Sequence, residues 1–155
     1  AVLFNDRIAA VLRDQGGELA HGYTYSGHPV CAAVALENIR ILQDENILET
    51  CRNETGPYLA ERWQALGEHP LVGEARIAGM VGALELVPDK GVRRFFEDRG
   101  KVGALCRTMA LKNGLILRAT NDSMLLSPPL TINRTEIDEL FEKAWKSLNE
   151  TAEAI

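Results

Sequence analysis

Apolar residues recur along this chain at two spacings, one typical of amphipathic helices and one typical of short strands. The helical spacing predicts five helices, at residues 5–12, 29–43, 47–66, 101–113 and from 133 onwards. Strand-like runs lie at residues 1–4, 72–77, 80–87, 115–118 and 124–126. This order of helices and hairpins favours an α+β fold, with an antiparallel sheet covered by helices on one side.

Capping and turn residues mark the ends of several of these elements. Asn133, followed three residues later by Glu136, resembles the capping box that starts a helix. The Gly56–Pro57 pair predicts a kink in the third helix, because proline removes a backbone donor. Residues 121–123 read Asn-Asp-Ser, which favours a turn, so the last two strands are expected to form a hairpin.

The helix at residues 29–43 is apolar around most of its circumference, and Glu37, Asn38 and Arg40 are its main interruptions. A helix of this kind is normally buried between two surfaces. Residues 1–12 also have an apolar face that needs cover. We therefore expect the chain to self-associate or swap segments when it is studied alone.

Composition limits the class of protein. A chain of 155 residues with 46% hydrophobic and 25% charged residues is ordinary globular material and forms about one domain. Its 22 acidic and 17 basic residues give a net charge of −5, without a cluster of basic side chains. Because nucleic acids attract basic surfaces, no nucleic-acid partner is expected.

The cysteines and the apolar runs indicate the compartment. Cys31, Cys51 and Cys106 are odd in number and lack the spacing of metal ligands, which favours free thiols in a reducing compartment. The longest apolar run, residues 30–36, is far shorter than the roughly 20 residues needed to cross a bilayer. We expect a cytoplasmic protein without a membrane partner.

One segment carries the chemistry of an anion site. Residues 21–29 read His-Gly-Tyr-Thr-Tyr-Ser-Gly-His-Pro and stand directly before the apolar helix. The Thr24 hydroxyl and the free backbone amides of the helix start could together hold a phosphate. An ordinary N-terminal cap made by Thr24 is the alternative. Tyr23 and Tyr25 could line a channel or simply pack, and His21 and His28 lack a third metal ligand.

Arg118 is the second candidate, because it stands at the end of an apolar run, Leu115-Ile116-Leu117. An arginine is always charged, so burying it without an anion is costly. Its partner could be an aspartate or glutamate of the same chain, or an anionic ligand. The motif Ser127-Pro128-Pro129-Leu130 follows shortly afterwards.

These motifs, in this order, resemble the C-terminal part of the class III (omega) aminotransferases, enzymes of fold type I that use pyridoxal 5'-phosphate. The resemblance extends over nearly the whole chain, in these segments: Ala1 to Phe4, Gly17 to Pro29, Ala32 to Leu42, His69 to Gly73, Gly79 to Leu86, Gly114 to Arg118 and Ser127 to Leu130. The pattern is most similar to that of polyamine:pyruvate (putrescine:pyruvate) enzymes. It implies that residues 1–28 are a remnant of the cofactor-binding large domain, and that residues 29–155 form the interdomain helix and the C-terminal small domain.

The resemblance also implies roles for particular residues. Thr24 would contact the cofactor phosphate of a neighbouring subunit, with Tyr23 beside the cofactor, so the protein would be a homodimer or a dimer of dimers. Arg118 would bind the substrate carboxylate and swing aside when an amine without a carboxylate arrives. A single pocket could then accept both a small-molecule amine and a keto acid.

The Schiff-base lysine of such an enzyme is not matched in this sequence. None of the five lysines stands where the resemblance would put it, which is upstream of Ala1: Lys90, Lys101, Lys112, Lys143 and Lys146. We therefore expect this chain by itself to be inactive, as part of a parent that moves an amino group from a diamine or other primary amine to pyruvate. The alternatives are a transaminase for β-alanine, taurine or 4-aminobutyrate, and a free-standing α+β interaction module without a cofactor.

Overall fold

The computed structural model describes residues 3–19, 21–92 and 94–155. Its contacts divide the chain into two compact units, Ala1–Arg40 and Ile41–Ile155. The domain boundary implied by the family resemblance remains a prediction.

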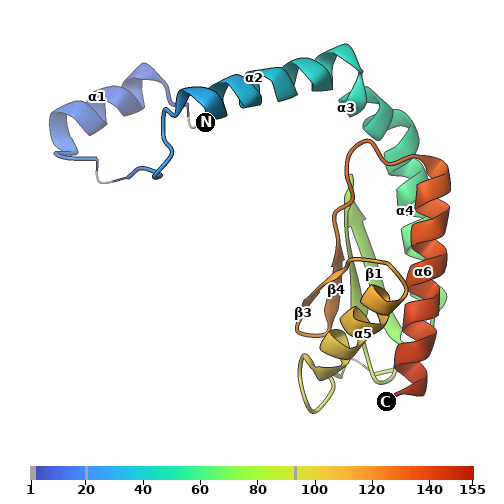
Figure 1. The fold of residues 1–155 in the computed structure, drawn as a ribbon. Helices are drawn as coiled ribbons and strands as arrows, with labels where there is room; N and C mark the ends of the chain where they lie inside the picture. Colours follow the sequence, from blue (N-terminus) through green and yellow to red (C-terminus); the bar gives the residue numbers. More distant parts are fainter. Residues whose placement is uncertain (1–2, 20, 93) are drawn as a thin grey trace. The chain divides into compact units, whose positions relative to one another are not determined.

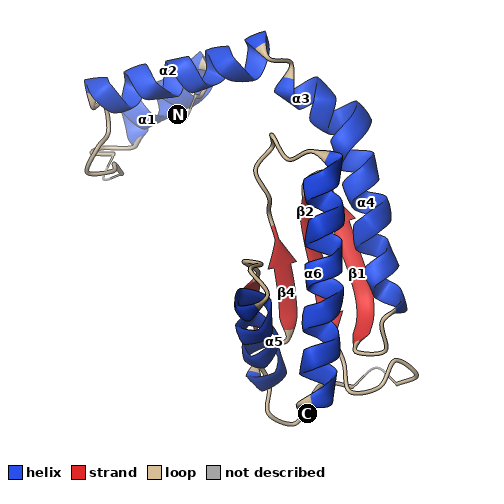
Figure 2. Ribbon diagram, turned by 45° about the vertical axis from the view of Figure 1, so that its right-hand side comes forward, coloured by secondary structure: helices blue, strands red, loops and turns tan. Residues whose placement is uncertain are grey.

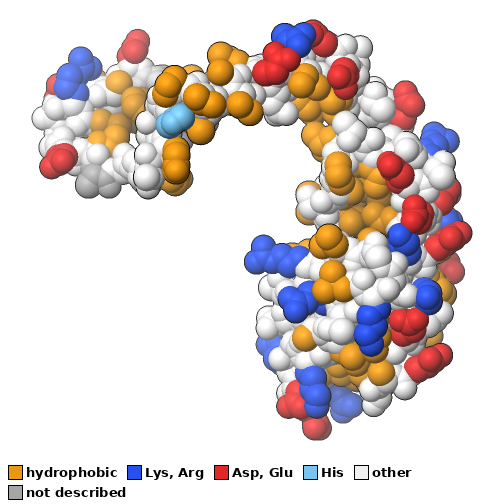
Figure 3. Space-filling model, viewed as in Figure 1, with side chains coloured by type: hydrophobic (Ala, Val, Ile, Leu, Met, Phe, Trp, Pro, Cys, Tyr) orange, Lys and Arg blue, Asp and Glu red, His pale blue; other side chains and the backbone are white. Residues whose placement is uncertain are grey.

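The first unit is helical. Helix α1 (Asp6–Gln15) begins after Asn5, whose side chain accepts a hydrogen bond of 3.2 Å from the amide of Ile8. Helix α2 (Pro29–Asp44) starts in this unit, and neither helix has a buried residue. Hydrophobic side chains are exposed along both helices (Figure 3). Of the strand expected at residues 1–4, the first two residues lie outside the described part, and the next two form no strand.

The second unit is a four-stranded antiparallel sheet with helices packed on one face, as the sequence predicts (Figures 1 and 2). The strand order is β1-β2-β4-β3. The strands are β1 (Val72–Ala78), β2 (Val81–Leu86), β3 (Arg118–Thr120) and β4 (Ser123–Leu126). The three helices that share the core with this sheet are α4 (Gly56–Ala65), α5 (Lys101–Lys112) and α6 (Arg134–Glu153).

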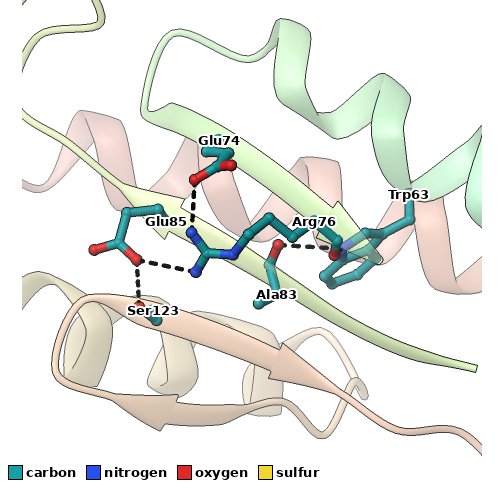
Figure 4. Close-up of polar contacts among 6 residues, drawn as sticks. All are labelled: Trp63, Glu74, Arg76, Ala83, Glu85 and Ser123. Carbon is teal, nitrogen blue, oxygen red and sulfur yellow. Dashed lines mark hydrogen bonds and ion pairs between the residues drawn. The ribbon is translucent and has the colours of Figure 1, made fainter. Parts of the chain in front are cut away.

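Alternation along the strands separates a core face from an outer face. In β2 the side chains of Leu84 and Leu86 are buried, whereas those of Ala83 and Glu85 point the other way. The core side receives Trp63 of α4, which is 1% exposed and whose indole N–H donates to the backbone carbonyl of Arg76 at 3.1 Å (Figure 4). The helices therefore cover one face and leave the other face open in this unit.

The helical stretch after α2 is irregular. It begins as α3 (Ile47–Thr50), continues as a π-helical turn, η1 (Cys51–Thr55), and ends as α4 followed by the 3-10 turn η2 (Leu66–Glu68). Where the sequence predicts a kink at Gly56–Pro57, the structure has the π-helical turn, in which the amide of Gly56 bonds to the carbonyl of Cys51, five residues earlier. Pro57 lies in the first turn of α4 and has no N–H to donate to the preceding turn.

The strand predicted at residues 115–118 is wrong. The amide of Leu115 instead donates to the carbonyl of Ala110 at 2.8 Å, which completes the end of α5, and Gly114 takes the left-handed conformation with φ of 74°. Leu115 and Leu117 are buried as predicted for an apolar run, but β3 begins only at Arg118. Arg118 therefore starts its strand and does not end one.

Helix α6 is confirmed, together with its capping box. The Asn133 side chain accepts from the amide of Glu136 at 3.0 Å, and the Glu136 carboxylate accepts from the amide of Asn133 at 2.9 Å. Two donors that a helix start normally leaves unpaired are thereby satisfied.

Candidate functional site

The turn that precedes α2 is closed by its own hydrogen bonds. The amide of Tyr23 donates to the Ser26 hydroxyl oxygen at 2.9 Å, and the amide of Ser26 donates to the Tyr23 carbonyl, also at 2.9 Å. A second turn follows, in which the amide of His28 donates to the carbonyl of Tyr25 at 3.1 Å. Thr24 lies inside the first turn, so its backbone is held although its side chain is not.

The Thr24 hydroxyl makes no hydrogen bond with the residues that the structure describes, and Thr24 is exposed. Helix α2 takes its first intrahelical bond from the amide of Ala32 to the carbonyl of His28 at 3.0 Å. His28 is therefore the cap residue. The alternative that Thr24 is an ordinary cap has no hydrogen bond in its support.

Helix α2 offers few backbone donors at its start. Pro29 has no N–H, so the amides of Val30 and Cys31 are the first-turn donors without an intrahelical acceptor. Within residues 3–19, 21–92 and 94–155 no side chain hydrogen-bonds to these two amides. The Thr24 hydroxyl and these amides are donors of the kind that a phosphate group accepts.

Arg118 projects from the outer face of the sheet. Arg118 pairs with Leu125 of β4, and Leu125 in turn pairs with Ala83 of β2. The side chains of these three residues therefore lie on the face that carries no helix. Arg118 is exposed, and no ion pair or hydrogen bond of its guanidinium is found in the described part of the chain. The alternative of an intramolecular salt bridge is therefore not observed, and the cation is available to an anion from outside.

Two acids on this face, Glu85 and Glu74, already have partners. The Glu85 carboxylate accepts from the Ser123 hydroxyl at 2.5 Å and lies 3.5 Å from the Arg76 guanidinium (Figure 4). Arg76 also forms a 2.6 Å ion pair with Glu74. Ser123 and Glu85 are paired across the strands one row along from Arg118. This network links three strands and leaves Arg118 outside it.

Other chemically active side chains give no second site. Each lysine contacts an acid, a carbonyl oxygen or a sulfur atom at the surface: Lys90 with Gly67, Lys101 with Asp98, Lys112 with Met109, Lys143 with Glu139 and Lys146 with Glu150. Burial raises the pKa of the Cys106 thiol, which disfavours the reactive thiolate. Among the described residues, no group of three potential ligands could hold a metal ion, and no helix is long and apolar enough to cross a membrane.

The sequence reasoning missed Asp122. Its side chain is 3% exposed, and its two carboxylate oxygens accept from the amides of Gly100 and Gly103 at 2.8 and 2.9 Å. In the sequence Asp122 looks like an ordinary turn residue between two strands. Its burial depends on α5, which lies about 20 positions earlier in the chain, and no local signal shows that contact.

Comparison with known proteins gives the family. The class-III aminotransferase profile matches residues 1–148. The chain therefore belongs to the class-III aminotransferases. It is 58% identical over 154 residues to the putrescine–pyruvate aminotransferase of Pseudomonas aeruginosa, a match that covers 99% of this chain and 33% of that protein. It is 35% identical over 158 residues to gamma aminobutyrate transaminase 1 of Solanum lycopersicum, covering 100% of this chain and 30% of that protein.

Solved structures agree with this assignment. The chain superposes on a transaminase determined with L-Ala at a TM-score of 0.86 and 36% identity, covering 97% of this chain and 36% of that one. The omega transaminase of Pseudomonas jessenii in complex with PMP gives a TM-score of 0.83 at 36% identity, covering 96% of this chain and 32% of that one. The α+β fold is thus part of a fold type I transaminase, and the chain spans about a third of the length of its relatives.

Members of this family use pyridoxal 5'-phosphate. Among the described residues the Thr24 hydroxyl and the amides of Val30 and Cys31 have no acceptor, so these donors are available to an anion such as the phosphate of that cofactor. The five surface-paired lysines do not form a comparable site for its reactive carbonyl carbon.

Proposed function

We propose that this chain is the part of a pyridoxal 5'-phosphate aminotransferase that contacts the cofactor phosphate and the acceptor's carboxylate. The parent enzyme would move an amino group from a diamine or another primary amine to pyruvate. The structural observation that carries the proposal is the unpaired Arg118 guanidinium on the open sheet face. The 58% identity to a putrescine–pyruvate aminotransferase supports this choice of substrates.

Thr24 and Tyr23 would serve cofactor binding. The hydroxyl of Thr24, with the amides of Val30 and Cys31, would donate to the phosphate oxygens of a cofactor in the neighbouring subunit. When bound, the cofactor supplies an electron-withdrawing ring that stabilises negative charge at the carbon carrying the amino group. The protein would then act as a homodimer or a dimer of dimers, because each active site needs a residue from the other subunit.

Arg118 addresses the requirement that one pocket accept two unlike substrates. A keto acid has a carboxylate, which a guanidinium binds through two parallel hydrogen bonds. A diamine has no carboxylate and is itself cationic, so a fixed cation would repel it. Since no described residue holds the Arg118 guanidinium, it can engage the acid and move aside for the amine.

The remaining assignments follow from the same proposal. Residues 1–28 would belong to the large domain and residues 29–155 to the interdomain helix and small domain. The lysine that attaches the cofactor would come from another part of the parent, so the 155-residue chain alone would be inactive. The three free cysteines favour the reducing cytoplasm as its location.

A transaminase that prefers 4-aminobutyrate is the second candidate, because relatives at about 35% identity carry that name. No observation favours β-alanine, taurine or a free-standing interaction module.

Amine-donor profiling of the intact parent with pyruvate tests the proposal. The proposal predicts that putrescine, or another diamine, gives a higher kcat/KM than 4-aminobutyrate, β-alanine or taurine. A preference for 4-aminobutyrate would instead support the second candidate, a 4-aminobutyrate transaminase. Absence of amino transfer from every donor would contradict the proposal altogether.

A further inference from the structure

A buried carboxylate ties the hairpin that carries Arg118 to the start of helix α5. Asp122 lies in the two-residue turn between β3 and β4, and its side chain is 3% exposed. One carboxylate oxygen accepts from the amide of Gly100 at 2.8 Å, and the other accepts from the amide of Gly103 at 2.9 Å. A buried carboxylate must be compensated, and these two bonds together with the helix dipole compensate it.

Helix α5 has no cap from its own sequence. Its N-cap residue is Gly100, which has no side chain to offer, so the amides at the start of the helix take their acceptor from the hairpin. Asp122 is 22 positions further along the chain than Gly100. The contact therefore does what a capping residue does, and it also links two elements.

The backbone of the turn is clamped as well. A Cβ on Gly103 would lie 2.0 Å from the carbonyl oxygen of Asn121, so the turn packs directly against the helix at a residue without a side chain. On the other side, the amide of Leu86 in β2 donates to the carbonyl of Asp122 at 2.9 Å. Asn121 is left-handed, with φ of 51°. The turn is thus held by α5 and β2 together.

We propose that Asp122 is a positioning residue for keto-acid binding. It fixes the turn of the short β3–β4 hairpin, and thereby the backbone from which Arg118 projects, while it leaves the guanidinium free to move. The inference rests on the proposed role of Arg118 and extends it. Strand β3 has three residues, so only Ala119, Thr120 and Asn121 separate the arginine from its anchor. A shift of the turn would therefore also shift the backbone of Arg118.

The two half-reactions of the intact enzyme test the proposal. Asp122→Asn keeps the size of the side chain but removes its charge and one acceptor oxygen, and Gly103→Ala forces the turn away from α5. In both variants the KM for pyruvate should rise roughly ten- to a hundredfold, as is typical of small misplacements of a binding group, with little change in kcat. The half-reaction with putrescine, which has no carboxylate, should stay within about twofold.

Asn133→Ala is the matched control, because it removes the cap of α6 without touching the hairpin. It should lower thermal stability by an amount similar to Asp122→Asn but leave the KM for pyruvate unchanged. An equal loss in both half-reactions, or the same rise in KM for Asn133→Ala, would overturn the proposal, since Asp122 would then act only on stability.

Hydrogen exchange of the intact protein gives a readout that does not depend on activity. Amides of residues 115–126 should exchange faster in Asp122→Asn and Gly103→Ala than in the unsubstituted protein, and Asn133→Ala should not change them. Unchanged exchange in the first two variants would refute the anchoring. If the unsubstituted protein transfers no amino group, the proposed function fails, while the exchange result still decides whether Asp122 anchors the hairpin.

Discussion

At the scale of single residues, the side chains proposed to contact ligands differ from their neighbours in lacking a protein partner. Ser26 closes its own turn, and Glu85 is held by Ser123 and Arg76. Thr24 and Arg118 make no such bond within the described residues. Thr24 and Arg118 are therefore available to a ligand, whereas Ser26 and Glu85 beside them are already engaged.

Thr24 can be tested by removing only its hydroxyl. Thr24→Val in the intact enzyme should weaken pyridoxal 5'-phosphate binding about tenfold, because one hydrogen bond to a charged phosphate is lost. Titration of the apoenzyme with the cofactor measures this. Thr24→Ser keeps the donor and should bind nearly as well as the unsubstituted protein. Equal affinity of the Val variant would exclude Thr24 from the phosphate site.

The roles of single residues were only partly predictable from the sequence. The sequence identified Thr24, Tyr23 and Arg118 as candidates, but it left the cap and the salt bridge open as alternatives. Whether Arg118 has an acidic partner depends on how Glu85 and Ser123 pair across strands, which is a nonlocal property. No spacing in the sequence reveals it.

At the scale of elements, local signals predicted the helices and the turn of the β3–β4 hairpin, but not the bounds of β3. The capping box of α6 comes from neighbouring residues and is confirmed, and a π-helical turn lies where a kink was predicted at Gly56–Pro57. The strand expected at residues 115–118 was wrong, because a short continuous apolar run looks the same whether it pairs in a sheet or is buried as an irregular segment after a helix. Here the bond from Leu115 to Ala110 decides between the two.

Packing of α4 on the sheet predicts a large effect at Gly82. A Cβ added there would lie 2.6 Å from the indole nitrogen of Trp63, which is 1% exposed and hydrogen-bonded to the Arg76 carbonyl. Gly82→Ala should therefore destabilise the protein by about 1–3 kcal/mol through overpacking. Denaturant unfolding measures the loss.

Gly22→Ala serves as the control, because a Cβ there has no atom within 4 Å. Its free energy of unfolding should match that of the unsubstituted protein within about 0.5 kcal/mol. If Gly82→Ala is equally neutral, the close contact between α4 and β2 is not present in solution.

At the scale of the whole molecule, the chain matches only one part of its relatives. It spans 33% of the putrescine–pyruvate aminotransferase that it resembles, and it presents apolar side chains along α1 and α2 (Figure 3). The sequence predicted that the apolar side chains of both helices are buried against other residues. Helix α2 is apolar around most of its circumference, and residues 1–12 have an apolar face. What covers them could not be deduced, because an apolar helix face indicates that it is buried but does not identify what it packs against.

The isolated chain can be used to test whether the residue that attaches the cofactor lies within this sequence. Mixed with pyridoxal 5'-phosphate and dialysed, the 155-residue chain should retain no cofactor absorbance, because its lysines lie at the surface and are paired there with acids or other surface groups. The intact parent should retain the cofactor under the same conditions. Retention of one cofactor per isolated chain would show that the attachment site lies within this sequence.

The most direct test of the account is the effect of Arg118→Ala on the two half-reactions of the intact enzyme. The account predicts that the pyruvate step loses about ten- to a hundredfold in kcat/KM, as expected for the loss of a charge-assisted bidentate contact, and that the putrescine step changes less than about threefold. Arg76→Ala, on the same face but paired with Glu74 and Glu85, is the control and should affect neither step. Equal losses in both steps of Arg118→Ala, or no loss in either, would contradict the account.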